Sequence, residues 1–183
     1  MTITLEQVTQ HLQRWQWQYH LQEEENCIIT GVKTQNDHNL GIVIRLLEDG
    51  KYLEISTSNL FPSIADNVYK GVIFQTLLTI CQETKLVRPA YSPMTGRLQL
   101  CVDIALEEKE LSDSQFDRYL NSLVAIADGL ILPRLQQVAA TGIDPEQEQW
   151  GEDFLCFLEK QVPAGFLEAL EKALLARHPK DSQ

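Results

Sequence analysis

The order of the periodic segments constrains this chain more than any single residue does. Apolar side chains recur first with a helical period, then alternate over three segments, and then repeat the change from helix to strands to helix. The order α-β-β-β-α-β-β-α predicts an α+β domain in which helices cover a single antiparallel sheet of about five strands, followed by C-terminal helices. The expected helices cover residues 5–19, 66–83 and 112–142, and the expected strands cover residues 27–33, 40–46, 52–55, 86–92 and 97–106.

The clearest local signal is a hairpin around Asp49-Gly50. Residues 40–46 alternate between apolar and other side chains, and residues 52–55 alternate again. Asp-Gly suits a two-residue type I′ turn because both central positions need a positive φ. Pro89 cannot donate a ladder hydrogen bond, so its strand is expected at a sheet edge or to be bulged. The strand over residues 97–106 should have one core face and one mostly polar face.

Capping residues mark the ends of two of the expected helices. Thr4 is a plausible N-cap for the first helix, and Ser112 with Gln115 has the form of a capping box. Pro133 lies within the last helical pattern, so that helix should kink or divide near residue 132. Gly142 is a natural C-terminal stop, because glycine adopts the left-handed conformation that often ends a helix.

The helix expected over residues 66–83 is apolar on two flanks. One flank carries Ile73 and Leu77, and the other carries Phe74 and Leu78. Asp66 is interpreted as a helix-start residue that satisfies free backbone N–H groups. The sheet can cover one flank, which leaves the other for the C-terminal helices or for a second subunit. Homodimerisation is therefore one expectation.

The composition changes after Gly142, and this change divides the chain into residues 1–142 and residues 143–183. The second part begins with a stretch rich in acids, read as a connector up to Gln149. Trp150 opens an amphipathic helix, and Pro163-Ala164-Gly165 separates it from a second short one. About forty residues are too few to fold without support, so these helices are expected to pack on the main domain.

The net charge of −11 opposes contact with phosphate backbones and anionic lipid. No basic segment followed by an apolar segment opens the chain, and no apolar run reaches about 18 residues. We therefore expect a cytoplasmic protein without a nucleic-acid or membrane partner. The same acids oppose peripheral membrane attachment through residues 150–158.

The sequence carries no motif that specifies a reaction, a cofactor or a metal. Its histidines, His11, His20, His38 and His178, lack the spacing of metal ligands. The strongest acid/base candidate is His38 beside Asp37, but adjacent loop residues rarely aim at one substrate atom, which favours a solvated turn. We therefore expect a protein that is not an enzyme and has no cofactor.

Candidate partner contacts come from three places. Trp17 falls outside the apolar stripe of the first helix, so its indole is either packed on the neighbouring chain or exposed for a partner. Arg97 and Asp103 share the polar face of one strand and are interpreted either as salt-bridged surface positions or as part of a ligand site. The full candidate set is Trp17, Phe74, Leu78, Arg97, Gln99, Asp103 and Trp150.

The element order, the turn at Leu47 to Lys51, the Ser112 capping box and the closing helix at residues 125–128 together resemble the YbjN-type bacterial proteins. These proteins are similar in fold to the type III secretion chaperones. The resemblance covers residues 5–141 and brings no catalytic residues. It implies a small, acidic, cytoplasmic and often dimeric protein with a regulatory or assembly role, because the secretion chaperones bind extended segments of partner proteins.

Two functional hypotheses follow from these observations. The first is a non-enzymatic protein-interaction module, chaperone-like or regulatory. The alternative is a small-molecule-binding protein or an undetected enzyme whose pocket lies between the sheet and the C-terminal helices. A concave cavity with convergent polar groups would favour the alternative.

Overall fold

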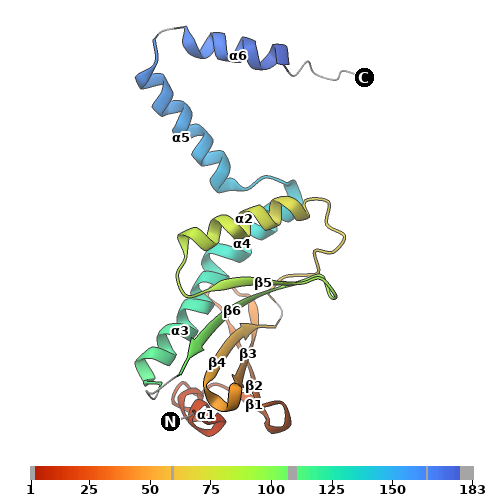
Figure 1. Cartoon of the computed structure of the whole chain (residues 1–183), viewed down its shortest axis with the longest axis vertical. Coiled ribbons are helices and arrows are strands. Elements are labelled where there is room, and N and C mark those ends of the chain that lie inside the picture. Colours follow the sequence, from red (N-terminus) through yellow and green to blue (C-terminus); the bar gives the residue numbers. More distant parts are fainter. Residues whose placement is uncertain (1–2, 59, 107–110, 164, 178–183) are drawn as a thin grey trace. The chain divides into compact units, whose positions relative to one another are not determined.

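The computed structural model of the chain describes residues 3–58, 60–106, 111–163 and 165–177. Its internal contacts divide it into two units, Met1–Gly142 and Ile143–Gln183. The elements of the first unit, shown in Figure 1, are α1 (Leu5–Arg14), β1 (Tyr19–Gln22), β2 (Cys27–Lys33), β3 (Asn39–Leu47), β4 (Tyr52–Thr57), α2 (Lys70–Glu83), β5 (Arg88–Ser92), β6 (Arg97–Ala105), α3 (Asp113–Ile126) and α4 (Leu132–Thr141).

The strands form one antiparallel sheet in the order β1-β2-β3-β4-β6-β5, six strands in all. The predicted α+β class with a single antiparallel sheet is confirmed, and the predicted number of strands was one too low. β5, which contains Pro89, lies at an edge of the sheet, as its missing N–H requires.

The additional strand is β1, which the sequence pattern assigned to the first helix. Thr4 is the N-cap of α1, as predicted, and it forms a capping box with Gln7, but the helix ends at Arg14. Gln16 has a φ of 57°, a left-handed conformation that breaks the helix, and Tyr19 then pairs with Thr30 of β2. Tyr19 packs against the same core from a strand, so its match to the helical spacing was a coincidence.

The core lies on one face of the sheet. Strand residues that alternate inward are fully buried there, and helices α1, α2, α3 and α4 contribute to the same cluster. The strand residues include Ile28, Ile42, Ile44, Leu53, Ile55, Leu98 and Leu100, and the helix residues include Val8, Leu12, Ile73, Ile80, Phe116, Leu120 and Leu135. The helices of the first unit therefore cover one face of the sheet, here called the core face.

The hairpin between β3 and β4 is present, but its turn differs from the prediction. Leu47 pairs with Tyr52, so four residues connect the strands instead of two. Glu48, Asp49 and Gly50 all have positive φ values, 51°, 54° and 82°, in a short 3₁₀ turn. Asp-Gly thus marked the position of the hairpin correctly, while the positive φ at Glu48 made the loop longer.

Helix α2 starts at Lys70, later than the predicted start at Asp66. The preceding residues form turns, and Asn67 holds them in place. Its side chain accepts a hydrogen bond from the Tyr69 amide at 2.8 Å and donates one to the Ala139 carbonyl at 3.2 Å. Asp66 is exposed in this turn and caps no helix, so its predicted role was wrong.

The long C-terminal helix of the first unit begins at the Ser112 capping box, as predicted. A π-helical turn, Ala127–Ile131, interrupts it before α4. Pro133 explains the position of this turn, because a proline ring clashes with the carbonyl four residues earlier, here that of Gly129. The irregularity predicted near residue 132 is therefore a π turn, and the helix ends at Gly142, whose φ is 74°.

The stretch Asp113–Thr141 is long and apolar enough to cross a membrane by length and composition alone. Its apolar character has a simpler origin in this fold. Phe116, Leu120, Leu123, Leu135 and Val138 lie in the shared core, which a core helix requires.

The second unit consists of α5 (Pro145–Gln161) and α6 (Phe166–Arg177). The Asp144 side chain caps α5 by accepting a hydrogen bond from the Glu146 amide at 3.2 Å. The predicted connector up to Gln149 is therefore largely helical. Pro163 and Gly165 separate the two helices, and Ala164 lies outside the described residues.

Candidate interaction surfaces and pocket

The second face of the sheet, here called the outer face, carries a row of charges across four strands. Arg45 stands opposite Glu54, and Glu54 stands opposite Asp103. The Arg45 Nη1 atom lies 3.1 Å from Glu54 Oε1, and the Arg88 guanidinium donates to the Asp103 carboxylate. Opposite charges on neighbouring strands attract one another, so this row makes the face polar and holds its charged side chains in place.

A second row on the outer face is more apolar. It runs from His20 through Ile29, Val43 and Ser56 to Cys101. Ile29 is 37% exposed, whereas Ser56 and Cys101 are buried at the centre of the sheet. Burial raises the pKa of the Cys101 thiol to about 11, so this thiol is a small apolar group in the face and not a nucleophile.

Three of the sequence candidates lie together on this face. Arg97, Gln99 and Asp103 alternate outward along β6. Asp103 is a salt-bridged surface position, and its partner is Arg88 of the neighbouring strand. Sequence spacing along one strand could not reveal this partner, since β5 and β6 are paired by register.

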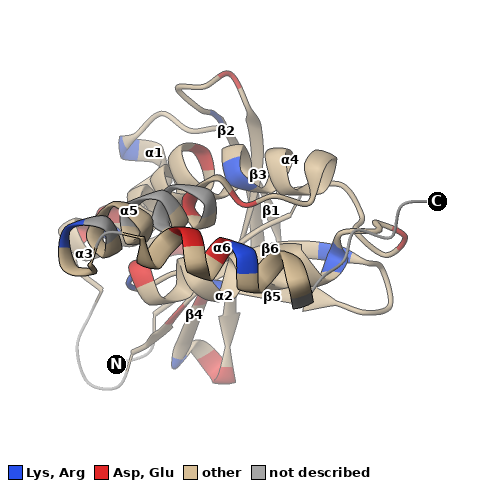
Figure 2. Cartoon of the chain, turned by 90° about the horizontal axis from the view of Figure 1, so that it is seen from above, with Lys and Arg blue, Asp and Glu red and all other residues tan. Residues whose placement is uncertain are grey.

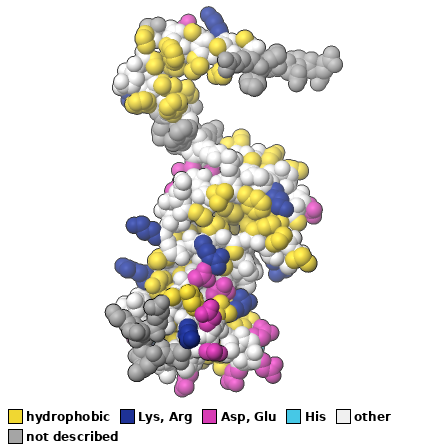
Figure 3. Space-filling view, viewed as in Figure 1, with side chains coloured by type: hydrophobic (Ala, Val, Ile, Leu, Met, Phe, Trp, Pro, Cys, Tyr) yellow, Lys and Arg dark blue, Asp and Glu magenta, His cyan; other side chains and the backbone are white. Residues whose placement is uncertain are grey.

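Phe74 and Leu78 lie elsewhere, on α2. The Phe74 ring packs edge-on against Tyr91 of β5, with ring centroids 5.0 Å apart, and the Lys70 ammonium lies 4.9 Å from the Tyr91 centroid. Leu78 is 68% exposed. Figure 3 shows hydrophobic side chains gathered over α2 and β5. On the second flank of α2, Phe74 is therefore covered by β5, whereas Leu78 is exposed.

Trp17 lies between α1 and β1, at the opposite end of the strand order from β5. Its ring packs edge-on against Trp15, with centroids 5.5 Å apart, and its amide donates to the Leu12 carbonyl at 3.1 Å. The indole is partly buried against the core. Trp150 belongs to α5, but its side chain lies outside the described part of the chain.

Charges of both signs are interspersed over the described residues, as Figure 2 shows. Among these residues, no group of three or more His, Cys, Asp or Glu side chains could hold a metal ion. The described surface therefore offers mixed charge to a partner and no cluster of metal ligands.

A buried carboxylate that the sequence analysis did not single out anchors the turn between β2 and β3. Asp128, in the π turn, is 6% exposed. It accepts hydrogen bonds from the Thr34 hydroxyl at 2.6 Å, the backbone N–H of Asn36 at 3.2 Å and His38 Nδ1 at 2.8 Å. His38 thus pairs with Asp128, while Asp37 pairs with Lys33 at 2.6 Å, so the carboxylate that contacts His38 is not that of its neighbour in the sequence.

The hydrogen bonds to Asp128 decide its charge. Burial raises the pKa of this carboxyl, but the hydrogen bonds from Thr34, His38 and Asn36 outweigh burial and leave the pKa lowered. Asp128 is therefore an ionised acceptor that ties the turn to the helix. Asp128 and His38 are far apart in the chain, so no spacing in the sequence pointed to their contact.

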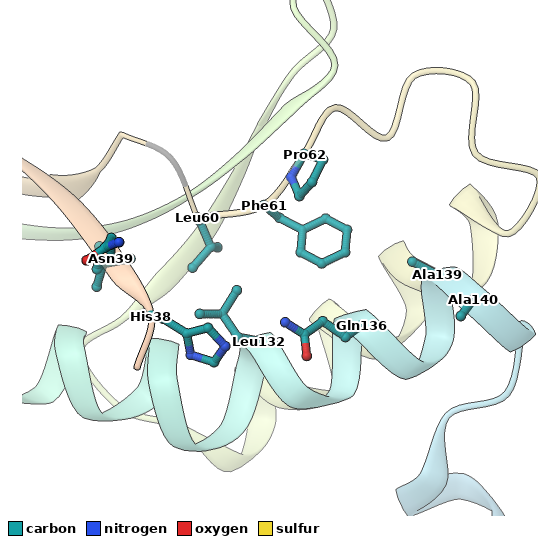
Figure 4. Close-up of a pocket in the computed structure, with 10 residues that line it drawn as sticks. His38, Asn39, Leu60, Phe61, Pro62, Leu132, Gln136, Ala139 and Ala140 are labelled. Carbon is teal, nitrogen blue, oxygen red and sulfur yellow. The ribbon is translucent and has the colours of Figure 1, made fainter. Parts of the chain in front are cut away.

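A pocket of about 480 Å³ lies beside this anchored turn. Figure 4 shows it between the start of β3, the loop after β4 and helix α4. Its lining residues are His38, Asn39, Leu40, Leu60, Phe61, Pro62, Leu132, Gln136, Ala139 and Ala140. The lining is mostly apolar with a few polar groups, which is the usual character of a small-ligand site, and its volume falls in the usual range of about 300–1,000 Å³.

No protein-family model matches the chain, and no curated protein matches it. Several solved structures are similar to it, and three of them are compared below. A chain of the ExsC–ExsE complex is 19% identical, with a TM-score of 0.51, and the alignment covers 72% of this chain and 95% of that one. YbjN from E. coli, described as a candidate transcription regulator, is 14% identical with a TM-score of 0.53, over 75% of this chain and 94% of that one.

The third similar structure is the HopA1–SchA chaperone–effector complex, at 11% identity and a TM-score of 0.45, over 67% of this chain and 88% of that one. The assignment of the fold therefore rests on the other two structures. The chain has a YbjN-like fold of the kind found in type III secretion chaperones, as the resemblance implied. Identities this low establish the fold alone.

Proposed function

We propose that this chain is a cytoplasmic, non-enzymatic protein-interaction module, chaperone-like or regulatory, that holds a segment of a partner protein on the outer face of its sheet. The observation that carries the proposal is the one-sided packing of the first unit. Helices α1 to α4 bury their apolar residues on the core face, so the outer face is left to make other contacts.

The composition of the outer face supports contact with protein. Its apolar row includes Ile29 and Val43, and its polar row offers paired charges at Arg45 and Glu54. Non-obligate protein interfaces are about as polar as the rest of a protein surface, so this mixture of apolar and charged residues is suited to a transient complex. A face of this kind can hold main chain and side chains of an extended segment through hydrogen bonds and small apolar contacts.

The shared fold also supports a protein-binding role. One of the similar structures is a complex of two proteins, and the shared fold gives this chain the same type of scaffold. Because fold does not determine function, the partner's identity does not transfer from that complex.

Homodimerisation is a second, separate element of the proposal, and its surface is the open part of the α2 flank. Leu78 contributes exposed apolar area there. Light scattering over a range of concentrations tests it. A concentration-dependent dimer that Leu78→Glu dissociates would support this element, and a monomer at every concentration would refute it.

The main proposal is tested by capture of partners from lysate of the native host with tagged protein, followed by mass spectrometry. Ile29→Glu places a charge in the apolar row of the outer face. Val68→Glu is the matched control, because Val68 is 86% exposed and lies outside the sheet. We expect Ile29→Glu to reduce recovery of a specific protein by about tenfold, the effect of a loss of about 1.4 kcal/mol, while Val68→Glu leaves recovery unchanged.

Circular dichroism and thermal melting of both variants establish that they fold. A captured protein whose recovery is equal for the folded Ile29→Glu variant and the wild type would refute binding by the outer face.

A further inference from the structure

The pocket beside α4 has one feature that a simple hollow between elements would lack. A polar side chain at its edge, His38, is held in one orientation by a buried carboxylate, Asp128. A second hollow of about 660 Å³ lies beside α1, but Glu6, Glu23 and Asp49 line it, so its lining is more polar. The α4 pocket is therefore the stronger candidate for a ligand site.

The hydrogen bonds around Asp128 determine the tautomer of His38. An ionised carboxylate can only accept hydrogen bonds, so the His38 Nδ1 atom, 2.8 Å from Asp128 Oδ1, must carry the hydrogen. In the neutral ring, Nε2 then carries the lone pair and accepts hydrogen bonds. The Thr34 hydroxyl and the Asn36 amide donate to the same carboxylate, which fixes its position.

The remaining walls are mostly apolar, with Asn39 and Gln136 as the other polar groups, and leave room for a flat ring. Figure 4 shows His38 and Gln136 on either side of Leu132, with the Phe61 ring on the opposite side of the space from α4. Pro62, Ala139 and Ala140 extend these walls. The small alanine side chains leave space on the helix side, and Phe61 offers an aromatic ring against which a second ring can stack or pack edge-on.

We propose that this pocket binds an aromatic ring that carries an N–H or O–H donor, such as an indole or a phenol, and that the donor bonds to Nε2 of His38. The ring fills the space between Phe61 and Leu132, and the donor satisfies the acceptor that Asp128 orients. The Gln136 amide can accept or donate at the opposite side of the ring. The same chemistry is present in a free small molecule and in a tryptophan or tyrosine side chain of a polypeptide.

Asp128 also stabilises the fold by anchoring the turn, but this structural role does not by itself require the bond to His38. Thr34 and Asn36 already tie the turn to the helix. The bond to His38 adds a fixed orientation for a ring that is 30% exposed and lines the pocket. A fixed polar group at the edge of an apolar cavity is what orients a ligand in known sites.

The test is a titration of the full chain with indole, followed by amide chemical shifts in NMR spectra. We expect indole to shift the signals of the lining residues, notably Phe61 and Gln136, in a saturable way. 3-Methylindole and 1-methylindole are isomers of equal size, but only the first retains the N–H donor. Loss of one hydrogen bond should weaken the binding of 1-methylindole about fivefold relative to 3-methylindole.

Variants locate the binding. Ala140→Phe fills the pocket from α4 and should abolish the shifts, whereas Gln137→Phe, on the same helix but outside the lining, should leave them unchanged. His38→Ala keeps the Thr34 and Asn36 bonds to Asp128, so it should fold and should bind the two methylindoles equally.

A tripeptide with a central tryptophan and blocked ends separates the two sources of the ring. Competition with indole would identify a polypeptide side chain as an acceptable ligand, and indole binding without competition would identify a free small molecule. Absence of saturable shifts with indole, or equal binding of the two methylindoles to the wild type, would overturn the proposal.

This inference does not rest on the proposed function. The outer face and the pocket use different residues, so the response to Ile29→Glu and the response to indole can fail separately.

Discussion

His38 and Asp128 are ninety residues apart in the chain, and the ring Nδ1 of the first lies 2.8 Å from a carboxylate oxygen of the second. This contact joins the turn between two strands to the π turn of a helix. It makes a buried charge part of the fold and orients a polar ring at the edge of a pocket.

Asp128→Asn should lower the free energy of unfolding by about 1–3 kcal/mol, because the amide nitrogen would face groups that donate to the carboxylate. Urea denaturation of the variant and the wild type at neutral pH measures the loss. Asp66→Asn is the control, since Asp66 is exposed and caps no helix. Equal stability of Asp128→Asn and the wild type would contradict the role given to this carboxylate.

The contribution of Asp128 to the free energy of unfolding should be lost in acid. Its pKa is lowered in the folded protein, and the hydrogen bonds that outweigh burial favour the ionised form. The stabilisation is therefore present above the ordinary carboxyl value of 3.8 and is lost as the pH falls through the lower folded value. The stability difference between wild type and Asp128→Asn should shrink from neutral pH to about pH 3, and a constant difference in urea denaturation would argue against it.

Gly142→Ala should destabilise the first unit. Gly142 has a φ of 74°, and a Cβ atom there would lie 2.5 Å from the Tyr69 ring. The left-handed conformation alone costs a residue with a Cβ atom about 1–2 kcal/mol, and the contact adds to that. Gly71→Ala is the comparison, because Gly71 lies in α2 with open space around it.

Thermal melting should therefore show a fall in midpoint for Gly142→Ala and an unchanged or higher midpoint for Gly71→Ala. If both substitutions had the same small effect, the close approach of Tyr69 to Gly142 would be refuted.

The cysteines should react in order of exposure. Cys156 is exposed and should be alkylated first by iodoacetamide at neutral pH. Cys101 is buried, and burial raises its pKa to about 11, so it should react only after urea unfolds the protein. Mass spectrometry of peptides after timed alkylation gives the order, and early labelling of Cys101 in the folded protein would contradict the burial of its thiol.

Local signals in the sequence predicted much of the fold. The N-cap at Thr4, the capping box at Ser112, the stop at Gly142 and the edge position of Pro89 depend on neighbours within a few residues, and the structure confirms them. β1 was missed because Tyr19 continued the helical spacing, while the left-handed conformation of Gln16 has no marker in the sequence.

The candidate site depended more on contacts between distant segments. Alternation along β6 placed Arg97, Gln99 and Asp103 on one face, but the true partner of Asp103 is Arg88 of the next strand. Asp128 reads in the sequence as one polar residue in a helix. Its function as an acceptor for Thr34, Asn36 and His38 exists only after the sheet and the helix have come together.

The most direct test of the central claim is photocrosslinking in the native host. A photoreactive amino acid at Gln99, on the outer face, is compared with the same amino acid at Val68, which is exposed and lies outside the sheet. Binding by the outer face predicts a covalent adduct with a specific host protein from position 99 and none from position 68. An adduct from position 68 without one from position 99 would contradict the account.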